Sequence, residues 1–97
     1  MSAAPSSKIW LGNLPFGIPS AKVLRAVHSR GILGVVGGFV KNPRNGYASG
    51  ESAQGVFTCS DVQAAAHALV MDGVVVEEWW GDTQPLPLIV MFRVGRM

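Results

Sequence analysis

The sequence predicts an α+β fold, a four-stranded antiparallel sheet with two helices on one of its faces. Segments with apolar residues at every second position, which is typical of strands, alternate with segments whose apolar residues recur at helical spacing. These segments follow one another in the order β, α, β, β, α, β. Two interleaved strand-helix-strand units of this kind place both helices on the same face and leave the other face uncovered.

Turn and cap residues separate the predicted elements. Gly31 and Gly73 stand where the two helices should end, and Ser20 is placed to cap the first helix. Ser60 begins a capping box with Gln63 at the second helix. This order defines a ferredoxin-like βαββαβ topology. The predicted elements are strands at 8–13, 32–41, 53–59 and 88–94, helices at 20–30 and 60–71, a mobile loop at 42–51, and an additional short strand within 74–80.

Length and composition limit the class of protein. The chain has 97 residues, which suits one domain at 8–94 between a flexible tail at 1–7 and a C-terminal tail at 95–97. Only 14% of the residues are charged, where about 25% is usual. We therefore expect some apolar surface to remain exposed, and such a surface usually marks a partner. The net charge of +2 permits a nucleic-acid partner without demanding one.

The sequence argues against several other classes. Cys59 is the only cysteine, which excludes a disulfide framework and a multi-cysteine metal site, so we expect no cofactor and no metal. We expect it to pack as a small apolar side chain. The N-terminus lacks the features of a signal peptide, and no apolar run is long enough to span a membrane. We expect a nuclear or cytoplasmic protein that is not secreted.

The segment 9–14 (IWLGNL) resembles the short ribonucleoprotein motif of the RNA recognition motif family, and Pro15 follows it as is common there. The resemblance covers residues 8–94, nearly the whole chain. It implies a module that binds single-stranded RNA on the open sheet face, with Trp10 stacking on a base. Further positions that match the family pattern are Ile18, Val23, Ala26, Val27 and Gly31 in the first half, and residues 57–61, Ala65, Ala68 and Leu69 in the second.

The third strand departs from the family pattern. The longer ribonucleoprotein motif of the family aligns with residues 52–59 of this chain. The two exposed aromatic positions of that motif fall on Gln54 and Val56, and Ser52 stands where the family usually has a basic residue. Stacking is worth about 1–3 kcal/mol per base, so two missing rings weaken binding by roughly 2–6 kcal/mol, or one to four decades of affinity. We therefore expect weak binding by the isolated domain, micromolar or poorer, with Gln54 able to hydrogen-bond a base edge.

Other candidates follow from the predicted strands. Basic residues, among them Arg96, are placed to contact phosphates at the rim of the sheet. In the last strand we assign Leu88, Val90 and Phe92 to the core, because that set carries no charge. Gly12 and Asn13 are better suited to the backbone turn than to the ligand. The predicted RNA-contacting residues are Lys8, Trp10, Gly12, Asn13, Lys41, Arg44, Gln54, Val56, Ile89, Met91 and Arg93.

The sequence raises two alternatives to RNA binding, of which the first remains open. The first is a protein-interaction or self-associating module that uses the apolar sheet face or Trp79 and Trp80, of which a strand would expose one. Those two tryptophans also suit core packing, and the acidic residues around them disfavour RNA. The second is an enzyme of the acylphosphatase type, which needs a basic residue in the loop after the first strand. The loop at 14–19 has none, so we expect no catalytic residue and no enzyme.

Overall fold

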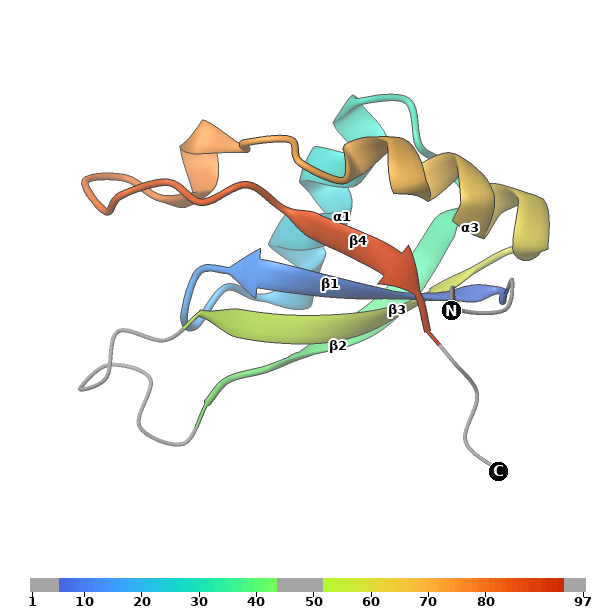
Figure 1. The fold of residues 1–97 in the computed structure, drawn as a ribbon, viewed down its shortest axis with the longest axis horizontal. Coiled ribbons are helices and arrows are strands. Elements are labelled where there is room, and N and C mark those ends of the chain that lie inside the picture. Colours follow the sequence, from blue (N-terminus) through green and yellow to red (C-terminus); the bar gives the residue numbers. More distant parts are fainter. Residues whose placement is uncertain (1–5, 44–51, 94–97) are drawn as a thin grey trace.

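The computed structural model describes residues 6–43 and 52–93, and it has the predicted α+β architecture (Figure 1). One antiparallel sheet has the strand order β2-β3-β1-β4, as in a ferredoxin-like βαββαβ fold. Both helices lie on the same side of it, and we call the opposite side the open face (Figure 1). The elements are β1 (Lys8–Leu14), α1 (Ser20–Ser29), β2 (Val35–Lys41), β3 (Ala53–Cys59), α3 (Val62–Ala68), the 3-10 turns η1 (Leu69–Met71) and η2 (Glu77–Trp79), and β4 (Ile89–Phe92).

Some of the sequence predictions fall outside the described residues. These are Arg44, Arg96, most of the predicted loop at 42–51, nearly all of the N-terminal tail and the whole C-terminal tail. The helices that the structure describes include none long and apolar enough to cross a membrane.

The core lies between the sheet and the two helices, and its residues alternate along the strands as predicted. Ile9, Leu11 and Phe57 are fully buried, because every second side chain of a strand points to the same face. The core assignment of the last strand is also confirmed, since Val90 and Leu88, which directly precedes β4, are buried and Phe92 packs against the core from its margin. The other side chains of the strands are thereby directed to the open face.

The first helix is capped one residue earlier than predicted. Pro19, in extended conformation, occupies the cap position, and its carbonyl accepts hydrogen bonds from the backbone N–H groups of Lys22 and Val23. Ser20 is therefore the first helical residue and makes no side-chain cap, so the predicted cap is wrong. The predicted stop is confirmed, because Gly31 has a φ of 85°, a left-handed conformation that glycine adopts without a steric penalty.

The second helix is capped by Asp61 rather than Ser60. Oδ1 of Asp61 accepts a hydrogen bond from the backbone N–H of Ala64 at 2.8 Å, so the predicted capping residue is wrong by one position. The helical segment continues through η1 and ends before Gly73, where φ is 86°. Asp72 then accepts a hydrogen bond from the backbone N–H of Val90, which ties the end of this segment to β4.

The second strand is shorter than predicted. It begins at Val35 instead of Ile32, and its pairing with β3 is irregular between Val35 and Gly37. Gly34 lies against Ala64 of α3, where a Cβ atom would overlap the Ala64 methyl group. The glycine-rich run therefore contains an irregularity of pairing, which breaks the alternation of side chains between the two faces near the start of β2.

The segment 74–80 contains the 3-10 turn η2 at 77–79 and no strand, so the predicted short strand is wrong. Trp79 and Trp80 are both only 8% exposed. In a strand, one of two adjacent residues would point away from the core, whereas a turn of this kind allows both rings to enter it. The expectation that one of the two tryptophans is exposed is therefore wrong, and the pair presents no free ring to a protein partner.

Candidate nucleic-acid interface

Strand pairing brings four apolar side chains into one row across the open face. Phe39 of β2 pairs with Val56 of β3, Val56 pairs with Trp10 of β1, and Trp10 pairs with Met91 of β4. Directly paired residues of an antiparallel sheet lie on the same face. With neighbouring strands 4.7–4.9 Å apart, the row spans about 14 Å. We call these four residues the apolar row.

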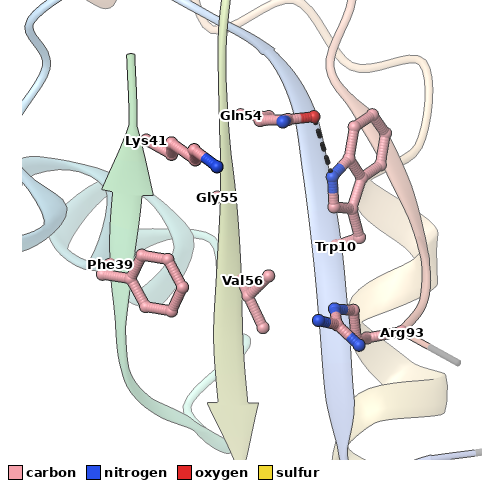
Figure 2. A pocket seen from close by; sticks show the side chains of 7 residues that line it. All are labelled: Trp10, Phe39, Lys41, Gln54, Gly55, Val56 and Arg93. Carbon is pink, nitrogen blue, oxygen red and sulfur yellow. Dashed lines mark hydrogen bonds between the residues drawn. The ribbon is translucent and has the colours of Figure 1, made fainter. Parts of the chain in front are cut away.

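A hollow of about 240 Å³ lies over three of the four residues of the apolar row, all but Met91 (Figure 2). The Phe39 side chain is 59% exposed, and Val56 lies between it and Trp10. Basic side chains border the hollow and none of its lining residues is acidic. The lining residues are Trp10, Phe39, Lys41, Gln54, Gly55, Val56 and Arg93.

The indole ring of Trp10 is held in place from two sides. Its Nε1–H donates a hydrogen bond to Oε1 of Gln54 at 3.1 Å, the dashed line in Figure 2. Its six-membered ring lies over Gly12, where a Cβ atom would come within 2.7 Å of Cζ3. Trp10 is half-buried as a result. A flat group whose orientation is fixed before a ligand arrives loses less conformational entropy on binding.

Basic side chains lie on both sides of the apolar row. Lys41, two residues beyond Phe39 in β2, pairs with Gln54. In the other direction along the strands, Lys8 pairs with Thr58, and its carbonyl accepts the backbone N–H of Arg93 at 2.9 Å. The alternation of the strands places Lys8 on the same face as Trp10. Apolar surface flanked by cations is suited to a ligand with flat bases and a phosphate backbone.

Asn13 shapes the end of β1. Pairing with β3 is irregular between Leu11 and Leu14, and Asn13 has a φ of 62°. Its Nδ2 donates a hydrogen bond to the carbonyl of Pro87 at 2.8 Å, and its Oδ1 accepts one from the Ser52 hydroxyl at 3.4 Å. Asparagine tolerates left-handed backbone better than most residues, so its presence here has a backbone reason. Asn13 thus joins β1 to the segment that leads into β4.

The structure brings most of the predicted RNA-contacting residues together. Trp10, Gln54, Val56, Lys41 and Arg93 line the hollow. Others lie on the same face beside it: Met91 pairs with Trp10, Ile89 pairs with Gly12, and Lys8 lies two residues before Trp10 in β1.

Asn13 serves the backbone at the end of the strand, as expected, whereas Gly12 lies within β1 and not in a turn. Gly12 makes room for the indole, and the side chain of Asn13 is engaged within the protein. Contact of any of these residues with RNA stays a prediction.

Phe39 is the residue of this surface that sequence patterns alone do not identify. In the sequence it belongs to a glycine-rich apolar run without clear alternation. A signal is present, because Lys41 is assigned to the open face and the residue two positions before it must share that face. The irregular pairing lies before Phe39, between Val35 and Gly37, and leaves this relation intact. The relation is hard to see in the sequence because residues 35–40 are all apolar or glycine, so no polar residue among them marks the open face.

Cys59 packs in the core, as predicted. Its side chain is buried at the end of β3. Burial, together with the negative charge of Asp61, raises the pKa of the Cys59 thiol. Because the thiolate is the reactive form, a raised pKa lowers reactivity at neutral pH. Within the described ranges, no group of three potential metal ligands occurs.

The chain matches no model of a known protein family and no curated protein sequence. The function is therefore inferred from the residues and the geometry of the open face.

Proposed function

We propose that the chain is a single-stranded RNA-binding module of the RNA recognition motif type, with bases stacking on Trp10 and Phe39. The observation that supports this proposal is the apolar row, which presents two aromatic rings on one open sheet face. Base-aromatic stacking is worth about 1–3 kcal/mol per base and tolerates any base. Lys41 and Arg93 border the same hollow, where they can neutralise phosphates.

Phe39 changes the expected affinity. A surface with Trp10 alone lacks two of the three rings of the family pattern. Phe39 restores one ring, on β2 instead of β3, so the deficit falls to about 1–3 kcal/mol, or one to two decades of affinity. The proposed module is thus weaker than one with three rings, but stronger than the sequence motif alone predicts.

An NMR titration of the full chain with a pool of short single-stranded RNAs tests the proposal. We expect the largest amide shifts around Trp10, Phe39 and Gln54. Replacement of either ring, as Trp10→Ala or Phe39→Ala, should weaken binding roughly 5- to 150-fold, the equivalent of one lost stacking contact. Val70→Ala is the matched control, because Val70 is 63% exposed but lies in η1, which follows α3.

The proposal fails if the shifts avoid the open face, or if Val70→Ala weakens binding as much as Phe39→Ala does. Circular dichroism of each variant separates a loss of binding from a loss of fold.

Self-association through the open face is the second candidate function. Phe39 and Met91, at the two ends of the apolar row, are 59% and 47% exposed. Exposed apolar surface of this kind also suits a protein partner or a second copy of the chain. Sedimentation over a wide concentration range tests the homodimer: Phe39→Ala should shift the equilibrium toward monomer, and a chain that stays monomeric throughout excludes it.

A further inference from the structure

Hydrogen-bond donors dominate the side chains that line the hollow. Lys41 and Arg93 carry donors and no acceptor, and the indole of Trp10 carries one N–H donor. Phe39 and Val56 contribute no hydrogen-bonding group. Gln54 is therefore the one lining residue whose side chain contains an acceptor, its amide oxygen.

The amide oxygen of Gln54 is already engaged. Nε1 of Trp10 lies 3.1 Å from Oε1 of Gln54. An indole N–H can only donate, so the oxygen of the Gln54 amide must be the atom that faces it. The NH2 group then points away from the indole, toward the side of the hollow where Lys41 lies (Figure 2). A ligand in the hollow thus meets the donor end of Gln54.

We propose that this site selects keto bases, uracil and guanine, over the amino bases cytosine and adenine, through donation from the Gln54 NH2 group to the exocyclic base oxygen. This inference rests on the RNA binding proposed above. Guanine and uracil carry an acceptor oxygen where adenine and cytosine carry an NH2 donor. A donor that meets another donor leaves both unpaired, which is more costly than the loss of the bond itself.

The same contact argues against recognition of adenine. A free glutamine amide can bind N6 and N7 of adenine at once, but this requires its oxygen and its NH2 group together. In this protein the Trp10 N–H already uses one of the two acceptor sites of that oxygen and turns it toward the indole. Binding adenine in that manner would require the oxygen to turn toward the base, at the expense of the hydrogen bond that also fixes the orientation of the stacking ring.

Equal-length oligouridine and oligocytidine of about eight nucleotides, within the range of known single-strand sites, provide the test with the full chain. The two bases are nearly the same size and differ in the exocyclic group at position 4 and in the proton on N3, which uracil carries and cytosine lacks. We expect oligouridine to bind about three- to tenfold more tightly at the same salt concentration, the effect of one net hydrogen bond.

Gln54→Glu is a nearly isosteric variant that keeps the acceptor function of the Gln54 amide and removes its donor function. One carboxylate oxygen can still accept the Trp10 N–H, while the outward NH2 donor becomes an acceptor. The added negative charge lowers the affinity for both oligomers, but the preference should reverse toward oligocytidine. Gln63→Glu makes the same change of charge at an exposed position of α3, and it should leave the preference for oligouridine intact.

The outcomes separate this inference from the proposed function. Equal affinity for the two oligomers, with Trp10→Ala still weakening both, overturns the base selection and leaves the RNA-binding proposal standing. A uridine preference that persists in Gln54→Glu also overturns the base selection alone. If neither oligomer binds, or if Trp10→Ala has no effect, the proposed function fails and this inference fails with it.

Discussion

Gly12 determines where the Trp10 ring lies. The six-membered ring covers the Gly12 backbone, and this position brings the Nε1–H within reach of Gln54. Any side chain at residue 12 would occupy the same space. The atoms that a Cβ at residue 12 would overlap belong to the far end of the Trp10 side chain, so the indole ring can move aside while the backbone stays in place. Residue 12 is thus expected to control binding more than folding.

We predict that Gly12→Ala displaces the Trp10 ring and breaks its hydrogen bond to Gln54 while the fold is retained. The indole N–H resonance of Trp10 should shift, and RNA affinity should fall as far as it does for Trp10→Ala. Gly37→Ala is the matched control, because Gly37 lies in the same sheet and its Cβ atom would contact nothing within 4 Å. An unchanged indole resonance in Gly12→Ala would disprove this role of Gly12.

The η2 turn shows what local sequence patterns leave undetermined. The β-branched and aromatic residues of 74–80 favour a strand. Burial of two consecutive indole rings outweighs that preference, since each ring removes a large apolar area from water. Among the described residues, neither indole N–H has a hydrogen-bond partner, so each carries a penalty that the buried rings offset.

Trp79 should therefore contribute to stability and not to binding. Trp79→Ala should lower the free energy of unfolding by about 3–5 kcal/mol, the usual cost of removing a large buried aromatic ring. Trp79→Phe should cost much less, because it keeps most of the ring and removes an unpaired donor. Urea unfolding measures both changes. Val70→Ala, at an exposed position, should stay within about 0.5 kcal/mol, and a similar value for Trp79→Ala would contradict the core assignment.

For the molecule as a whole, the sequence is most informative where a pattern repeats. Alternating apolar residues and the order of elements predict the sheet, the helices and the position of Trp10 on the open face. Asp61 in place of Ser60 escapes prediction because adjacent polar residues compete for one cap, and only the backbone conformation decides between them. Phe39 escapes prediction because residues 35–40 of β2 are all apolar or glycine, so no alternation with polar residues marks the face on which its ring lies.

The distribution of charge over the whole molecule governs how salt should affect binding. Lys8, Lys41 and Arg93 lie on or beside the open face, and if each neutralises one phosphate of a single strand, log K should fall against log salt with a slope of about −2. Lys41→Gln should reduce the magnitude of this slope by about 0.7. Trp10→Ala should instead lower the affinity at every salt concentration and leave the slope unchanged, because stacking releases no counterions.

The control for this prediction is Lys22→Gln, which removes the same charge from an exposed position of α1 in the helical layer. Its slope should equal that of the unaltered chain. Fluorescence anisotropy of a labelled RNA, measured at several salt concentrations, gives all four slopes. A reduced slope for Lys22→Gln together with an unchanged slope for Lys41→Gln would place the phosphates on the helical side of the molecule, and the open face would then not be the nucleic-acid interface.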